Sequence, residues 1–233
     1  NFSESWQVHR DTIEKVFALS DFVSEHCLRD AWFLTELLDN ELLLASSLDF
    51  QHLLGQQLNE VSDEEQLLRQ LRRFRNLHML RIAWRDLLNL QDIEESLLQV
   101  SVLADQLITQ AYSWLYKNLA IRFGEPVGMH GQLPMFIIGM GKLGGGELNF
   151  SSDIDLIFTY PENGETKGGK KSIEHQQFFT KLAQELISAL HQHTVDGQVF
   201  RVDMRLRPFG ESGPLVMHFD AMEDYYQEQG REW

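Results

Sequence analysis

The chain has 233 residues, of which 43% are hydrophobic and 24% charged, a composition typical of a globular protein and not of a disordered one. Acidic residues outnumber basic ones by 35 to 20, and the resulting net charge of −15 argues against a nucleic-acid-binding protein, because such proteins need a basic surface. No apolar run approaches the ~18 residues of a membrane span.

The single cysteine, Cys27, excludes an internal disulfide, and we expect it to be a small buried hydrophobe. No signal peptide opens the chain at Asn1, and Trp233 falls within a predicted helix. We therefore expect a fragment of a longer protein.

The first part of the chain, up to about Gly124, is predicted to be helical. Segments 13–22 and 32–54 have apolar residues at helical spacing. The clearest helix starts at Ser62, where Ser62 and Glu65 have the spacing of a capping box. Its apolar stripe consists of Leu67, Leu71, Phe74, Leu77, Leu80, Trp84 and Leu87.

A second long helix is predicted to start after Asp92, with Glu95 completing a similar cap. It ends near Gly124, because Pro126 follows just beyond. These patterns predict a helical domain over residues 1–124.

The helix that starts at Ser62 is unusually basic outside its apolar stripe. We interpret these arginines as a solvated face, and the alternative is a basic wall that meets phosphates or an acidic partner. They are Arg69, Arg72, Arg73, Arg75, Arg81 and Arg85.

After Pro126 the pattern changes, and residues 125–233 are predicted to form a second domain with strands and helices. Strands are predicted over 135–140, 153–160 and 199–206, a mobile loop over 161–172, a helix over 178–190 and a turn at 196–197. The fold class is therefore α+β, with a helical amino-terminal half and a small mixed sheet.

Two carboxylates on the second strand are the main candidates for chemistry. Asp153 and Asp155 lie two residues apart and so share one face of a strand, while Ile154 and Leu156 enter the core. Carboxylates held this close repel one another unless a cation lies between them, and hard oxygen ligands suit Mg²⁺ or Mn²⁺. An Asp-x-Asp pair alone is a weak signal, because most such pairs are exposed acids.

A glycine-rich turn, Gly139 to Gly146, precedes the acid pair. Glycines allow backbone N–H groups to approach phosphate oxygens closely, although a tight structural turn is the alternative. Lys142 is followed by Leu143, so the turn is not a Walker loop, and the acid pair that follows does not fit a dinucleotide-binding fingerprint. Ser151 and Ser152, just before the acid pair, supply donors that either bind phosphate or cap the strand.

The last predicted strand carries a third carboxylate. Arg201, Asp203, Arg205 and Arg207 alternate onto one face, with apolar residues on the other. An acid flanked by guanidiniums is typical of a site where metals and phosphates meet, and surface ion pairs of little energetic value are the alternative.

The order of glycine turn, Asp-x-Asp strand and third Asp strand resembles the polymerase-β-like nucleotidyltransferases. Within that superfamily, segments 141–156 and 201–215 resemble the family of bifunctional enzymes that adenylylate and deadenylylate glutamine synthetase, and segment 79–87 is similar too. The amino-acid sequences of segments 146–150 and 207–213 resemble those of the amino-terminal, adenylyl-removing domain of these enzymes. Lys142 departs from the wider superfamily, in which a serine commonly follows the glycine.

The resemblance implies a polymerase-β-like core that acts on phosphate esters with Mg²⁺ or Mn²⁺. Asp153, Asp155 and Asp203 would be the catalytic and metal-binding residues. The residues that would bind nucleotide and phosphate are Gly141, Lys142, Gly144, Ser151, Ser152, Arg205 and Arg207.

The implied reaction is phosphorolysis, in which phosphate removes AMP from an adenylylated tyrosine of glutamine synthetase and gives ADP. Adenylylated glutamine synthetase, ADP, ATP and phosphate would be its ligands, a PII-type signalling protein its regulator in the full-length enzyme, and the cytoplasm its compartment, with no nucleic acid or membrane partner. ATP-dependent adenylylation is the nearest alternative, and a non-catalytic module that binds nucleotide or a regulator is the alternative from another class.

Overall fold

The structure is a computed structural model that describes residues 2–39 and 42–229. The predicted helix at Trp233 therefore ends outside the described residues. The chain divides into two compact units, one formed by Asn1–Leu107 with Gly146–Phe150 and the other by Ile108–Gly145 with Ser151–Trp233. The long helix α6 contributes residues to both.

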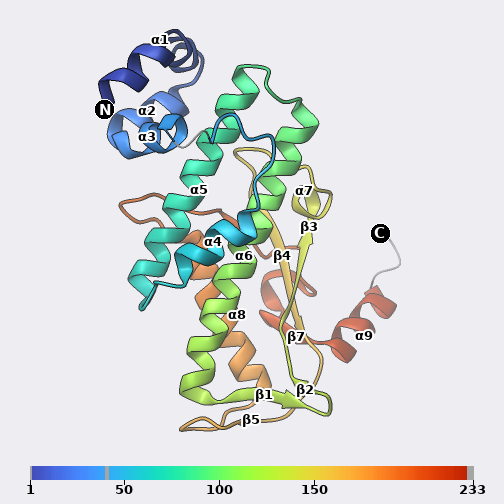
Figure 1. The fold of residues 1–233 in the computed structure, drawn as a ribbon. Coiled ribbons are helices and arrows are strands. Elements are labelled where there is room, and N and C mark those ends of the chain that lie inside the picture. The colour runs from blue at the N-terminus through green and yellow to red at the C-terminus, as the bar shows by residue number, and fades with distance from the viewer. Residues whose placement is uncertain (1, 40–41, 230–233) are drawn as a thin grey trace. The chain divides into compact units, whose positions relative to one another are not determined.

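The first unit is built from helices, as the apolar spacing predicts, but residues 42–49 of the segment predicted as helical over 32–54 are not helical (Figure 1). The helices are α1 (Phe2–Leu19), α2 (Asp21–Arg29), α3 (Ala31–Asp39), α4 (Phe50–Leu58), α5 (Glu64–Leu87) and the first part of α6 (Ile93–Phe123). One apolar cluster joins α1, α2, α3 and α5, with Trp84 fully buried at its centre. Cys27 belongs to this cluster, which confirms its prediction as a buried hydrophobe, and burial raises the pKa of its thiol to about 12.

Helix starts follow the capping rules, with one shift of register. The N-cap of α5 is Asp63, whose side chain accepts a hydrogen bond from the Gln66 N–H at 2.8 Å. The capping box predicted at Ser62 and Glu65 is therefore wrong by one residue, because the Asp63 carboxylate takes the capping position and Ser62 instead bonds to the Gln66 side chain. Asp92 accepts from the Glu95 N–H at the start of α6, as expected.

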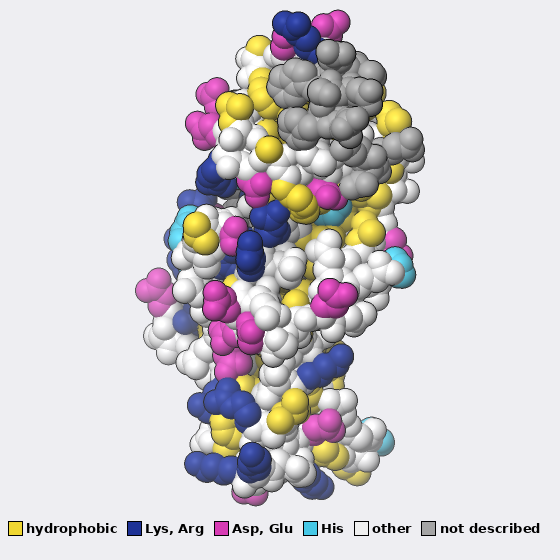
Figure 2. All heavy atoms as spheres, turned by 60° about the vertical axis from the view of Figure 1, so that its left-hand side comes forward, with side chains coloured by type: hydrophobic (Ala, Val, Ile, Leu, Met, Phe, Trp, Pro, Cys, Tyr) yellow, Lys and Arg dark blue, Asp and Glu magenta, His cyan; other side chains and the backbone are white. Residues whose placement is uncertain are grey.

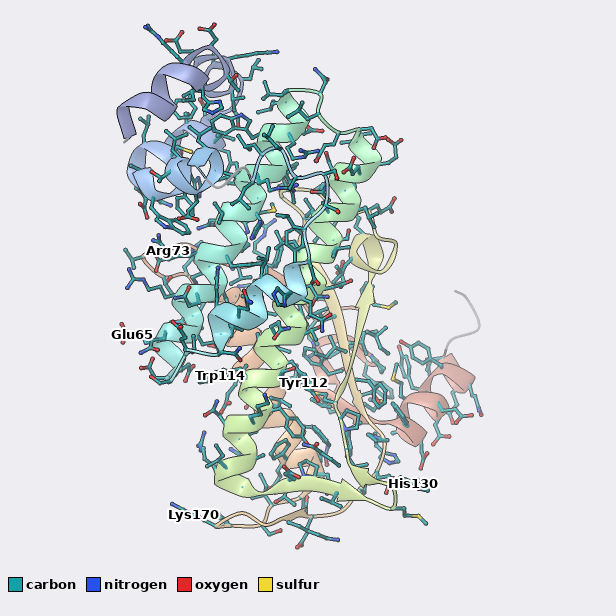
Figure 3. All side chains as sticks on the ribbon, viewed as in Figure 1. Glu65, Arg73, Tyr112, Trp114, His130 and Lys170 are labelled. Carbon is teal, nitrogen blue, oxygen red and sulfur yellow. The ribbon has the colours of Figure 1, made fainter. Side chains whose placement is uncertain are left out.

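Most of the basic residues of α5 are not a solvated face, and this prediction is wrong for them. Arg72 and Arg81 are fully buried and Arg85 nearly so, whereas Arg69 is exposed as predicted. Arg73, which Figure 3 labels on α5, pairs with Asp30 at 2.9 Å and lies over the Trp32 ring. The error arose because the spacing shows an apolar stripe and does not show that α5 is buried on its other sides as well.

The buried arginines bind the chain that connects α3 to α4. Arg81 donates to the carbonyl oxygens of Leu42 and Ala45, and Arg85 donates to that of Leu43 at 2.6 Å. Because main-chain carbonyls in an irregular segment need donors when they are buried, these guanidiniums hold the segment in place.

The second unit contains the sheets (Figure 1). The main one has the order β3-β4-β6, with β3 (Phe136–Met140) antiparallel to β4 (Ile154–Tyr160) and β6 (Val202–Asp203) parallel to it, and with β7 (Val216–His218) parallel to the far end of β4. The second sheet joins β1 (Glu125–Gly128), β2 (Gly131–Gln132) and β5 (Thr166–Lys167). The predicted strands 135–140 and 153–160 are confirmed, and so is the α+β class with mixed sheets.

Helices α8 (His175–His191) and α9 (Phe219–Gln229) pack against the main sheet, while α7 (Gly141–Gly144) and η1 (Gly210–Ser212) are single turns. Two sequence predictions need correction here. Segment 161–172, expected as a mobile loop, contains β5 because buried Thr166 bonds to the carbonyl of Phe123. The strand expected over 199–206 shrinks to two residues, since the chain turns at Met204.

Candidate functional site

The main sheet brings two of the predicted carboxylates side by side. Asp155 on β4 pairs in parallel register with Asp203 on β6, and it pairs on its other side with Met140 of β3. Residues paired directly across neighbouring strands project to the same face of a sheet. The structure therefore brings together two acids that are distant in the sequence.

Asp153 lies just before β4, two residues before Asp155, and so shares the strand face of Asp155. Ile154 and Leu156 are fully buried, as the strand pattern predicts. The Ile154 N–H donates to the carbonyl oxygen of Arg201 at 2.9 Å, which fixes the chain at this point.

The glycine turn lies against the Asp155 carboxylate. Gly141 has φ of +56°, and a Cβ at this position would lie 2.9 Å from Oδ2 of Asp155. A Cβ on Gly144 would lie 2.5 Å from the carbonyl oxygen of Gly139. The glycines are thus required by close packing, and phosphate binding by this turn stays a prediction.

Segment 146–150, which follows the turn, belongs to the helical unit. Leu148 is fully buried, and its N–H donates to Oγ of Ser101 at 2.9 Å. Phe150 packs against the apolar cluster of the helices. These residues anchor the chain between the glycine turn and the acid pair.

Asp203 is held by Arg205. The Arg205 Nε donates to both carboxylate oxygens at 3.0 and 2.8 Å, its Nη2 also donates to Oδ2, and its backbone N–H donates to Oδ1 at 2.8 Å. These hydrogen bonds favour the charged form and hold the pKa of Asp203 below its ordinary value.

Asp155 is in the opposite electrostatic situation. Partial burial is the largest cause that raises its pKa, and the charges of Asp203 and Asp153 raise it further. A carboxylate that two neighbouring acids oppose is stabilised by any cation that enters the site.

Asp153 pairs with Arg201, a residue that we had placed on this face but not among the binding residues. The Arg201 Nε lies 2.5 Å from Oδ1 of Asp153 in an ion pair, and that buried oxygen accepts no hydrogen bond from any described residue. The signal in the sequence was the alternation that placed Arg201 with Asp203.

The remaining predicted binding residues lie around these acids. Lys142 donates to Oγ of Ser152 at 3.4 Å, and the carbonyl oxygen of Ser151 accepts from Arg201 at 3.4 Å. Arg205 and Arg207 follow β6 in a turn, so the prediction that they continue a strand face is wrong. Arg207 donates to the carbonyls of Met204 and Glu211 and so shapes that turn.

The donor set suits a hard divalent cation, although two of the three carboxylates, those of Asp153 and Asp203, are paired with arginines in this structure. Among the described residues, no group of three or more His, Cys, Asp and Glu side chains is arranged to hold a metal ion. Arg205 engages Asp203, and Arg201 covers Asp153. The buried Oδ1 of Asp153, which accepts no hydrogen bond, and the raised pKa of Asp155 both fit residues that would hold Mg²⁺ or Mn²⁺.

Other features restrict the class of protein. No helix in the described ranges is long and apolar enough to cross a membrane. On the face drawn in Figure 2, acidic and basic side chains are interspersed. The fold and the site thus define an α+β protein with an acidic centre at the start of two parallel strands, beside a glycine turn.

Comparison with known proteins identifies the family. The family model described as glutamate-ammonia ligase adenylyltransferase matches residues 11–233, and the chain belongs to that family.

Three relatives share one description, bifunctional glutamine synthetase adenylyltransferase/adenylyl-removing enzyme. The relative from Alteromonas mediterranea is 66% identical over 76% of this chain and 18% of its own length. The relative from Psychromonas ingrahamii is 57% identical over 94% of this chain and 24% of its own length. The relative from Shewanella oneidensis is 51% identical over 95% of this chain and 23% of its own length. The chain thus spans about a quarter or less of the length of these relatives.

Proposed function

We propose that this chain carries the adenylyl-removing activity, in which phosphate displaces AMP from an adenylylated tyrosine of glutamine synthetase. The observation that carries the chemistry is the parallel pairing of Asp155 with Asp203, beside Asp153. The choice of removal over transfer is supported by segments 146–150 and 207–213, whose form resembles the amino-terminal domain of the bifunctional enzymes. The relatives' shared description includes both activities.

The reaction needs an in-line displacement at one phosphorus atom. An oxygen of phosphate forms a bond to the phosphorus of the AMP group, the bond from that phosphorus to the tyrosine oxygen breaks, and the tyrosine oxygen takes up a proton, so that ADP and free tyrosine result. Bound Mg²⁺ or Mn²⁺ would supply charge stabilisation for the entering and leaving oxygens.

The chain's own residues contribute position and charge. Asp153 and Asp155 would hold the cations, and Asp203, kept charged by Arg205, would complete the site or orient the attacking oxygen. Lys142 and Ser152, which share a hydrogen bond, and Ser151 would donate to phosphate oxygens. Gly141 and Gly144 allow the backbone to come close, and Arg205 and Arg207 supply positive charge for the nucleotide.

The proposal includes partners and a compartment. Adenylylated glutamine synthetase and phosphate are the substrates, and ADP is a product. We propose a PII-type signalling protein as the regulator of the full-length enzyme, and the cytoplasm as the compartment.

The test is an assay with adenylylated glutamine synthetase, phosphate and Mg²⁺, in which ADP is measured. We expect ADP that depends on phosphate, and we expect Asp155→Asn to lower the rate by at least about a hundredfold, because removing one charged group from a preorganised site costs on that scale. Asp224→Asn on α9, an exposed acid away from the sheet pairing, is the matched control and should keep wild-type activity.

The outcomes separate the alternatives. AMP transfer from ATP to unmodified glutamine synthetase, with no phosphate-dependent ADP, would replace removal by the opposite reaction. Nucleotide binding with neither reaction would indicate the non-catalytic module. Near-full activity of the Asp155→Asn variant would refute the assignment of the site.

A further inference from the structure

The three acids of the site are neutralised unequally. Asp203 receives four hydrogen bonds from Arg205, including one from the backbone. In the described part of the chain, Asp155 has no ion pair within 4 Å. Asp153 lies between these extremes, because its one ion pair with a described residue is the contact of Oδ1 with Arg201.

The Arg201 contact is close but loosely built. The Nε atom lies 2.5 Å from Oδ1 of Asp153, and this ion pair is not among the hydrogen bonds that Oδ1 accepts. The Arg201 side chain is 62% exposed and that of Asp153 38%, so water screens the pair and solvates the guanidinium if it leaves. The second contact of Arg201, to the carbonyl oxygen of Ser151, is 3.4 Å long.

The charge of Asp153 already has a compensating cation. Oδ1 of Asp153 is buried and accepts no hydrogen bond from any described residue, so the Arg201 guanidinium at 2.5 Å compensates its charge. Asp153 and Asp155 stand on either side of buried Ile154 and share a strand face. A divalent cation bound to Asp153 would therefore compete with Arg201 for this carboxylate.

We infer that Arg201 is a positioning residue that acts as a displaceable counter-ion: it covers Asp153 while no metal is bound and must leave when a divalent cation enters. This inference rests on the proposed function, because it assumes that Asp153 and Asp155 hold the cation. Arg201 then sets the affinity for metal by competing for Asp153. Arg205, in contrast, stays on Asp203, since its hydrogen bonds include one from its own main chain.

The test measures binding of Mn²⁺ alone, by titration calorimetry and by the electron paramagnetic resonance signal of free Mn²⁺, without substrate. We expect Arg201→Gln to lower the Kd for Mn²⁺ by about fivefold or more, because one positive charge next to a divalent site is removed. Arg201→Lys keeps the charge and should stay within about twofold of wild type.

Arg122→Gln is the matched control. The Arg122 side chain is also 62% exposed, and it also pairs with an acid, Glu185, in the same unit, at 3.5 Å. This variant should bind Mn²⁺ as the wild type does. Thermal unfolding of each variant checks that the fold is retained.

Each outcome is decisive. Unchanged or weaker Mn²⁺ binding in Arg201→Gln, with binding that Asp155→Asn abolishes, would overturn the counter-ion role and leave the metal site standing. Tightening that occurs equally in Arg122→Gln would also overturn it. Wild-type protein that binds no Mn²⁺, or binds it regardless of Asp155, would refute the metal site and the inference with it.

Discussion

Arginines of the helical unit and arginines beside the acidic centre have opposite surroundings. Arg81 and Arg85 on α5 are buried, and they donate mainly to main-chain carbonyls and glutamine side chains. Arg201 and Arg205 are exposed and pair with carboxylates. The difference teaches that a guanidinium bound to neutral carbonyls stabilises the fold, while a guanidinium on an exposed acid can exchange with another cation.

Breaking the buried set should have the largest effect on stability. Arg81→Ala leaves the carbonyls of Leu42 and Ala45 without their donor and creates a cavity in a fully buried position. We expect the free energy of unfolding to fall by about 3 kcal/mol or more, measured by urea denaturation. Arg69→Ala, an exposed arginine of the same helix, is the control, and a loss as large there would contradict the distinction.

The burial of His78 near Arg81 should also make the helical unit less stable in acid. His78 packs against the rings of Phe50 and Phe74, and burial, with a smaller effect from the Arg81 charge, lowers its pKa to about 3. Unfolded His78 takes up a proton near pH 6.5, so the stability that neutral His78 contributes is full above that pH and is lost as the pH falls toward 3.

We expect the free energy of unfolding to fall by on the order of 1–2 kcal/mol between pH 7 and pH 5. The measurement is the unfolding midpoint in urea at each pH. His78→Phe keeps a buried ring and should remove most of this pH dependence. His52→Gln, at an exposed position on α4, should retain it. An unaltered slope in His78→Phe would show that other groups cause the acid sensitivity.

The charge of Asp155 in the acidic centre should change stability with pH in the direction opposite to that of His78, and by less. The raised pKa of Asp155 means that its charge is disfavoured in the folded protein, so it costs stability above its folded pKa. Asp155→Asn should raise the free energy of unfolding at pH 7 by a few tenths of a kcal/mol at most, because solvent screens this partly exposed group, while it removes activity.

The comparison is sharpened by Asp203→Asn, with the stability of both variants measured by thermal unfolding. The pKa of Asp203 is lowered, so its stabilising effect is present at pH 7, and the variant should be less stable. If both variants changed the free energy of unfolding in the same direction, the two acids would not differ in how they are neutralised, and the distinction between Asp155 and Asp203 would be wrong.

The sequence predicted the strand face of the acid pair better than it predicted the burial of α5. The alternation at Ile154 and Leu156 placed Asp153 and Asp155 on one face, because one side of β4 enters the core. The register between Asp155 and Asp203 could not be read in advance, since it depends on how α8 returns the chain to the sheet. The turn at Met204 was missed because alternation continues through residues that do not pair.

The arginines of α5 were misjudged for a related reason. A periodic stripe shows which side of a helix is apolar, but burial of the other sides depends on elements elsewhere in the sequence. Residues 76–85 are all buried, including three that carry a positive charge or a titratable ring: His78, Arg81 and Arg85. Only the tertiary structure supplies the carbonyl acceptors that make such burial tolerable.

The brevity of β6 has a kinetic consequence. Two residues of parallel pairing join Asp203 to Asp155, and the partners are separated in the chain by β5 and all of α8. Contacts of such high sequence separation form after local structure during folding, and a short ladder with few hydrogen bonds opens by local fluctuation more readily than a long one. We therefore expect the amide hydrogens of Val202 and Asp203 to exchange with solvent well before those in the middle of β4, so that the acidic centre is among the last features of the main sheet to assemble and among the first to open.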